Sequence, residues 1–273
     1  MDLQLLKKMA NEVRKGITES TFNAKSGHPG GSLSCTDILT YLYFEKMNVK
    51  VDEPKWEDRD RFVLSKGHCA PALYSVLANK GFFPVEDLKT LRKTDSYLQG
   101  HPCMKKVPGV DMSSGSLGQG ISAAAGMALS AKLSNKSYNV YTILGDGELH
   151  EGQVWEALLF AKGKNLTNLC VIVDNNDLQI DGRLSEVNSP YPLKEKFEAF
   201  GFNVCEIDGH NFNEIENAFK SFDKCCDKPT LILAKTIKGK GVSFMEDQCG
   251  WHGKAPNEEE YKLAMKELEG GEI

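Results

Sequence analysis

The second half of the chain alternates short apolar runs with segments of helical spacing. The apolar, β-rich runs stand at 139–144, 169–173, 202–207 and 230–234, and helical patterns occupy 150–163, 193–200 and 212–223. Strands that alternate with helices are typical of βαβ crossovers, which place the strands parallel in one sheet. The pattern therefore predicts an α/β fold with a mostly parallel, doubly wound sheet and helices on both faces.

The first half is less regular. Helical spacing covers 4–18, 36–48, 70–80, 85–93 and the alanine-rich 119–133, and 61–65 has the pattern of a short strand. A glycine-rich break at 26–31 separates the first two helical patterns, and 95–118 is rich in Gly, Pro and Ser and too long for a simple connection. A charged helix is predicted at 257–270. We expect residues 1–273 to form a single domain.

Composition limits the possible partners and the compartment. With 33 basic and 38 acidic residues the net charge is −5, which argues against a nucleic-acid or polybasic membrane surface. No apolar run approaches the ~18 residues of a membrane helix, and Lys7 and Lys8 stand where a signal peptide would be apolar. The eight cysteines form no CxxC pair and are interpreted as reduced thiols of a cytoplasmic protein.

Polar residues follow two of the predicted strands. Asp146 comes after the strand at 139–144 and Asn176 after the strand at 169–173. If these strands are neighbours, both side chains reach the same sheet edge, where ligands of open α/β sheets collect. A carboxylate with an amide oxygen suits Mg²⁺ or Ca²⁺, and Gly147 would let a phosphate approach the following helix. The alternative for each segment alone is a turn with a capping residue.

The histidines suggest a second set of polar groups. All six stand within two residues of a glycine: His28, His68, His101, His150, His210 and His252. Histidines on several glycine-rich loops indicate a polar site assembled at a sheet edge. No zinc spacing is present, and Gly118-Gln119-Gly120-Ile121-Ser122-Ala123 lacks the preceding strand of a dinucleotide site.

Together these motifs match a known family. Gly145-Asp146-Gly147, with Asn176 following 29 residues after Gly147, resembles the thiamine-diphosphate motif. Four further segments narrow the resemblance: 26–30 (SGHPG), 60–68 (DRFVLSKGH), 100–102 (GHP) and 115–120 (GSLGQG). With His252-Gly253 they resemble the N-terminal, diphosphate-binding section of a transketolase, over about residues 8–256.

The resemblance implies a role for individual residues. The implied Mg²⁺ ligands, which Ca²⁺ could also use, are Asp146, Asn176 and the backbone carbonyl of Leu178. The implied cofactor contacts are His68, His252 and the backbone of Gly147 at the diphosphate, and the backbone of Gly115, Ser116 and Leu117 at the aminopyrimidine. The implied catalytic, substrate-side histidines are His28, His101 and His252. His150 and His210 are interpreted as structural, and Glu151 resembles a glutamate between active sites.

One departure from the family changes the expected assembly. The glutamate that protonates the aminopyrimidine and the arginines that hold the sugar phosphate belong to domains that this chain lacks. The chain's own five arginines, Arg14, Arg59, Arg61, Arg92 and Arg183, are not among the residues to which the resemblance gives a role at the site. Met1 stands shortly before the first predicted helix, as at the N-terminus of a natural subunit. We therefore expect this chain to be one subunit of a split transketolase. It would work with a separate C-terminal subunit, with two copies of each chain in the assembly. The assembled enzyme would transfer a two-carbon ketol unit from a ketose phosphate to an aldose phosphate.

Three alternatives stay open at this point. A deoxyxylulose-phosphate synthase or a 2-oxoacid dehydrogenase α-subunit would share the thiamine-diphosphate motif but differ around His28 and His68. A non-catalytic module could bind Mg²⁺ and the cofactor without turnover. A plain Mg²⁺-nucleotide protein would bind ATP and no thiamine diphosphate.

Overall fold

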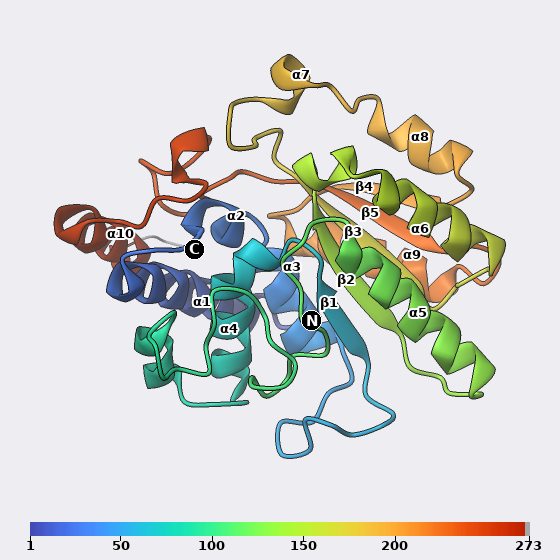
Figure 1. The fold of residues 1–273 in the computed structure, drawn as a ribbon, viewed down its shortest axis with the longest axis horizontal. Helices are drawn as coiled ribbons and strands as arrows, with labels where there is room; N and C mark the ends of the chain where they lie inside the picture. Colours follow the sequence, from blue (N-terminus) through green and yellow to red (C-terminus); the bar gives the residue numbers. More distant parts are fainter. Residues whose placement is uncertain (271–273) are drawn as a thin grey trace.

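The computed structural model describes residues 1–270 and contains one five-stranded parallel sheet (Figure 1). The strands are β1 (Arg61–Leu64), β2 (Val140–Gly145), β3 (Leu169–Asn175), β4 (Asn203–Asp208) and β5 (Thr230–Lys235), in the order β1-β2-β3-β5-β4. The predicted parallel α/β architecture is confirmed. The strand boundaries differ from the predicted ones by one or two residues.

Helices cover both faces of the sheet. One core contains residues of α1 (Leu3–Ala24), α2 (Pro29–Ser34), α3 (Thr36–Tyr41), α4 (Ala70–Lys80), α9 (Phe212–Lys224) and α10 (Glu258–Gly270). The other contains residues of α5 (Gln119–Leu133), α6 (Gly152–Gly163) and α8 (Leu193–Ala199). In Figure 1, α5 and α6 lie side by side over the sheet, and α9 lies behind it.

The buried strands explain the unbroken apolar runs. In β3, Cys170 and Ile172 belong to the first core, whereas Val171 and Val173 belong to the second. Successive side chains of a strand point to opposite faces, so a sheet covered on both sides needs apolar residues at every position.

Several predicted elements differ in the structure. The break expected at 26–31 contains the start of α2, with Pro29 at its first position, where a missing N–H costs nothing. The helix predicted over 36–48 is α3 followed by a π-helical turn at Leu42–Lys46, and that predicted over 85–93 is a 3₁₀ helix at Val85–Thr90. The short α7 (Leu184–Val187) has no counterpart among the predicted elements.

The strand register brings two predicted site residues to one place. Gly145 at the end of β2 pairs with Asp174 in β3, so Asp146 and Asn176 leave the sheet at the same edge. Residues 95–118 are mostly irregular and pass close to this edge, since Gly67, after β1, lies against Ser114 and Gly115. Within residues 1–270, no helix is both long enough and apolar enough to cross a bilayer.

Candidate active site

A cavity of about 250 Å³ lies at the carboxyl ends of β2 and β3. Eight residues predicted from the sequence line it: His68, Gly115, Leu117, Asp146, Gly147, Asn176, Leu178 and His252. His28, His101 and Ser116 do not line it. The motifs therefore predict half of the sixteen lining residues, and ligand sites of open α/β sheets lie at such an edge.

Asp146 is a buried carboxylate at the base of this cavity. Its side chain is only 3% exposed, and it accepts backbone N–H bonds from Gly147 at 2.8 Å and Asp177 at 2.6 Å. Burial, together with the nearby Asp174 carboxylate, raises its pKa from 3.8 to about 7. Ionising this buried carboxyl group at neutral pH costs free energy, and a bound cation would remove that cost.

Asn176 and Leu178 offer further oxygen atoms beside Asp146. The Asn176 amide nitrogen donates to Asp174 at 3.3 Å, and its Oδ1 accepts the Leu178 N–H at 3.1 Å and keeps a second lone pair. The Leu178 carbonyl accepts a bond of 2.9 Å from Lys238 Nζ and likewise keeps a second lone pair.

This donor set fits Mg²⁺. A carboxylate, an amide oxygen and a carbonyl are the hard oxygen ligands that Mg²⁺ prefers, and the remaining positions go to water or phosphate. Within the described part of the chain, no three His, Cys, Asp or Glu side chains converge as a metal site by themselves. A metal held here therefore needs oxygen atoms from a backbone carbonyl and a ligand as well.

Two buried lysines of the cavity are absent from the sequence-based prediction. Lys66 is 2% exposed; its ammonium pairs with Asp174, which is fully buried, and donates to the Gly31 carbonyl at 2.8 Å. Lys238 is 3% exposed and lies 3.1 Å from His252 Nδ1. Burial lowers the pKa of Lys238. Both lysines place positive charge at the cavity floor.

A second buried carboxylate fixes the loops around the cavity. Glu148 is 2% exposed, and its carboxylate accepts bonds from the Ser65 hydroxyl and from the backbone N–H groups of Gly118 and Gly145. It thereby joins the ends of β1 and β2 to the start of α5.

Three of the predicted histidines form one cluster. The ring centroids of His28, His68 and His252 lie 5.1–5.4 Å apart. Burial, followed by neighbouring positive charge, lowers the pKa of His28 to about 4 and that of His252 to about 3. Both rings are therefore neutral at pH 7 and can each accept and donate one hydrogen bond.

His101 borders the same cluster from another loop. A Cβ atom on Gly115 would lie 3.3 Å from the His101 ring, so the two loops are in contact. His101 is exposed, and partial burial together with the Arg92 cation lowers its pKa.

Arg92 departs from the sequence-based expectation that the arginines have no role at the site. Its guanidinium donates to the Ser26 hydroxyl at 3.2 Å and to the Gly100 carbonyl at 3.4 Å. Both acceptors belong to motif segments. The sequence offers no signal for this contact, because Arg92 stands in an ordinary charged stretch.

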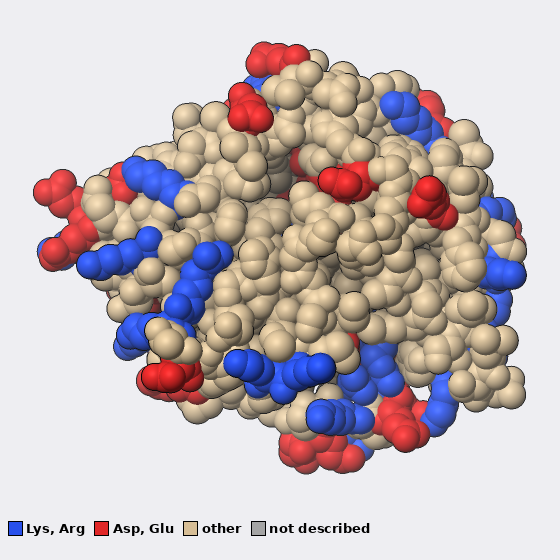
Figure 2. Space-filling view, in the orientation of Figure 1, with Lys and Arg blue, Asp and Glu red and all other residues tan. Residues whose placement is uncertain are grey.

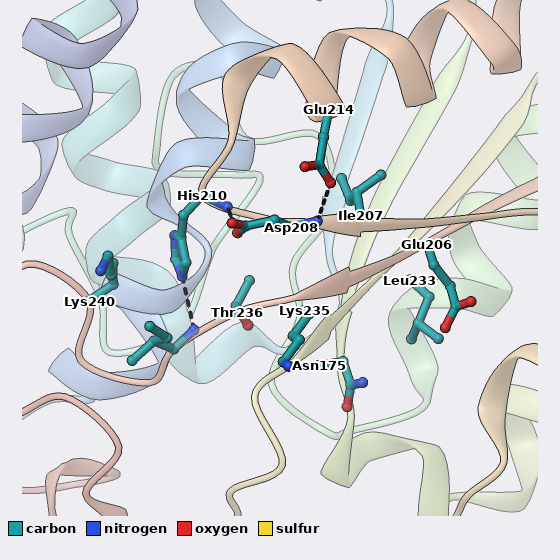
Figure 3. Close-up of a pocket in the computed structure, with 11 residues that line it drawn as sticks. Asn175, Glu206, Ile207, Asp208, His210, Glu214, Leu233, Lys235, Thr236 and Lys240 are labelled. Atoms are coloured by element: carbon teal, nitrogen blue, oxygen red, sulfur yellow. Dashed lines mark hydrogen bonds between the residues drawn. The ribbon is translucent and has the colours of Figure 1, made fainter.

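His210 belongs to a second cavity, of about 710 Å³, at the ends of β4 and β5 (Figure 3). His210 Nδ1 bonds Asp37 at 2.7 Å, and Nε2 accepts the Ile237 N–H at 2.9 Å. Both ring nitrogens are thus used in joining loops, in agreement with a structural role. His150 Nε2 bonds the Asn188 carbonyl at 2.7 Å, and Glu151 is exposed at the start of α6.

Comparison with known proteins agrees with this geometry. The family profile described as "Transketolase, thiamine diphosphate binding domain" matches residues 5–271. A 6-deoxy-6-sulfo-D-fructose transketolase subunit from Clostridium sp. strain MSTE9 is 47% identical over 264 residues, covering 97% of this chain and 96% of the relative. An apulose-4-phosphate transketolase subunit from Phocaeicola vulgatus is 42% identical over 268 residues, covering 98% of this chain and 95% of the relative.

A solved structure shows the same fold. Transketolase from Campylobacter jejuni superposes with a TM-score of 0.93 at 35% sequence identity. The match covers 98% of this chain but 43% of that enzyme, so this chain spans about two fifths of the solved transketolase.

Proposed function

This chain belongs to the transketolase family, in which it corresponds to the thiamine-diphosphate-binding domain, and on that basis we propose that it is one subunit of a split transketolase. With a partner subunit it binds Mg²⁺ and thiamine diphosphate and transfers a two-carbon ketol unit from a ketose phosphate to an aldose phosphate. The family predicted from the motifs is confirmed. The metal, the substrate pair and the partner are proposals.

The observation that carries the proposal is the pairing of β2 with β3. It brings Asp146 and Asn176 to one edge, in a cavity that His68 and His252 also line. Oxygen ligands for a cation and hydrogen-bond donors for a diphosphate thus stand next to each other, which is what a metal-bridged diphosphate requires.

The chain's own residues bind and orient the cofactor in this proposal. Asp146, Asn176 and the Leu178 carbonyl hold Mg²⁺, while the Gly147 N–H, His68 and His252 bind the diphosphate. Gly115, Ser116 and Leu117 support the aminopyrimidine through their backbone. The cofactor supplies the carbon nucleophile that protein side chains lack.

The substrate-side histidines hold and move protons at the donor sugar. His28 lies against the cavity-lining His68 and His252, and His101 lies against Gly115. The lowered pKa of each ring favours its neutral form at pH 7. A neutral imidazole accepts a proton from a hydroxyl group and returns it, which suits general acid–base catalysis. His252 contributes to both the diphosphate and the substrate.

A broad uncharged face supports the proposed partner. In Figure 2 most charged groups lie around the edge of the molecule, and the area over α5 is largely free of them, whereas acidic groups are visible over α6. Leu133, Leu159 and Phe160 on these helices are 76%, 59% and 41% exposed, and Gly126 and Gly152 have nothing within 4 Å of an added Cβ. Exposed apolar patches of this kind mark protein interfaces.

This face also reaches the cavity. Gly118, immediately before α5, bonds Glu148, and α6 begins just after the turn that contains Asp146 and Glu148. A subunit that covers α5 and α6 would therefore close the cavity mouth. We propose that residues 1–273 form one diphosphate-binding domain, that the loop at 95–118 faces the partner, and that two copies of each chain assemble symmetrically.

The experiment is reconstitution. The chain, Mg²⁺ and thiamine diphosphate are combined with and without the partner subunit, and ketol transfer is measured from fructose 6-phosphate, xylulose 5-phosphate and 6-deoxy-6-sulfofructose. Transfer only with the partner supports the proposal. Transfer by the isolated chain refutes the split enzyme, and cofactor binding without turnover on any donor in the assembled complex indicates the non-catalytic module.

A further inference from the structure

Arg92 joins the two loops that carry His28 and His101. Its guanidinium donates to Ser26, two residues before His28, and to the carbonyl of Gly100, immediately before His101. These loops are 73 residues apart in the sequence. One rigid, planar group therefore connects two loops that are distant along the chain.

The surroundings of Arg92 are built for this contact. Its backbone adopts a left-handed conformation, with φ of 62°, and its N–H donates to the Leu98 carbonyl at 2.9 Å. A Cβ atom at Gly100 would lie 2.9 Å from Arg92 Cζ, so the guanidinium rests directly on a backbone that only glycine provides.

The same loop is also held by a tyrosine. The buried Tyr74 hydroxyl bonds the carbonyls of Gln99 and His101, at 2.9 Å each. Arg92 and Tyr74 thus hold the three residues from Gln99 to His101 between them.

Among the residues that the structure describes, no carboxylate lies within ion-pair distance of the Arg92 cation. Within residues 1–270 it forms no ion pair, and its buried Nε has no hydrogen-bond partner. A half-buried cation without an anion is costly, and its charge acts on the histidines beside it.

We propose that Arg92 is a positioning residue, which fixes His28 and His101 relative to each other for the donor sugar. The expected effect of Arg92 on the kinetics rests on the proposed function. Its structural consequence, the spacing and protonation of the two rings, does not depend on turnover.

Groups other than Arg92 also act on the pKa values of His28 and His101. His28 also faces the rings of His68, His101 and His252, and the Cys69 thiol. His101 faces His68 and Cys69 in addition to Arg92. Burial lowers the pKa of both histidines, and Arg92 lowers both further. Removing the Arg92 charge should therefore raise both pKa values.

The test uses Arg92→Met, Arg92→Lys and Gly100→Ala in the assembled enzyme. Arg92→Met should lower donor kcat/KM by about 10- to 100-fold, as for a misplaced catalytic group, and leave thiamine-diphosphate affinity within about twofold. The acidic limb of its pH profile should move to higher pH. Arg92→Lys keeps the charge, so its acidic limb should stay in place while kcat/KM falls. Gly100→Ala displaces the guanidinium without altering Arg92 and should reproduce the kinetic loss.

Lys93→Met is the matched control, because it removes the same charge from the neighbouring, exposed residue. Histidine titration by NMR, with only this chain ¹³C-labelled, gives a readout without turnover. The pKa values of His28 and His101 should be higher than in wild type in Arg92→Met and the same as in wild type in Lys93→Met. If the wild type transfers no ketol unit, the proposed function fails while this titration still decides the role of Arg92. An Arg92→Met variant indistinguishable from Lys93→Met in kinetics or titration overturns the inference.

Discussion

Replacing Asp146 by Asn separates metal binding from fold stability. Asn keeps the shape of the side chain and one acceptor oxygen for the Gly147 or Asp177 N–H, but it removes the charge that would bind Mg²⁺. We expect thiamine-diphosphate affinity at saturating Mg²⁺ to fall more than about tenfold, since even outer contacts of a metal site contribute factors of about 10–100.

The metal-free fold should respond in the opposite direction. The folded chain holds the Asp146 proton with a pKa of about 7, against 3.8 for the free carboxyl, so the folded state binds more protons between these values. Stability therefore decreases as pH rises from about 4 to about 7, by at most about 4 kcal/mol from this group. The Asn variant lacks this titration but leaves one of the two backbone N–H groups without an acceptor, so its stability should change less than that of wild type between pH 5 and pH 8.

Two measurements check both signs. Urea denaturation of the metal-free chain at pH 5 and pH 8 gives the stability difference, and titration calorimetry of the assembled enzyme gives the affinity. Asp181→Asn is the control, because it removes an exposed carboxylate from the following loop. Wild-type cofactor affinity in Asp146→Asn would refute the metal assignment, and a stability difference between pH 5 and pH 8 equal to that of wild type would refute the charge argument.

The other predictions concern histidines and the partner. His68→Ala should weaken cofactor binding in calorimetry and leave donor KM at saturating cofactor near normal. His28→Ala and His101→Ala should keep cofactor affinity and lower kcat by about 10²–10³; loss of cofactor binding with intact donor kinetics would contradict this division. Phe160→Glu should weaken association with the partner more than about tenfold in sedimentation, without changing the melting temperature of the chain, because Phe160 is 41% exposed.

The strands and most long helices could be predicted because their patterns reflect burial. Runs such as Leu169–Val173 are apolar at each position, since both sheet faces are covered. Helix α2 could not be predicted, because Gly30 and Gly31 disfavour a helix. Packing requires them: a Cβ at Gly30 would lie 2.8 Å from the Trp251 carbonyl, and one at Gly31 2.9 Å from Cys69 Sγ. Tertiary contact here overrides local propensity.

The site residues could be predicted where the sheet topology alone determines their positions. Asp146 and Asn176 meet because parallel neighbouring strands end at one edge. Lys66, Lys238 and Arg92 reach the site through loops whose paths no periodicity reveals. Lys238 stands in Lys238-Gly239-Lys240-Gly241, which lacks the spacing of a phosphate loop, yet its ammonium lies on the cavity floor between Leu178 and His252.

The charges of the cavity explain why a metal and a diphosphate would bind together. Lys66 pairs with Asp174, which leaves Lys238 against the carboxylates of Asp146 and Glu148. With both carboxylates ionised, a diphosphate alone would enter a site of net negative charge, and Mg²⁺ alone would take its remaining ligands from water and not from a charged group. Each therefore removes an obstacle to the other, and linkage requires that each raise the affinity of the other by the same factor. The cavity thus selects the pair over either component, which also disfavours a role in binding free metal or free phosphate.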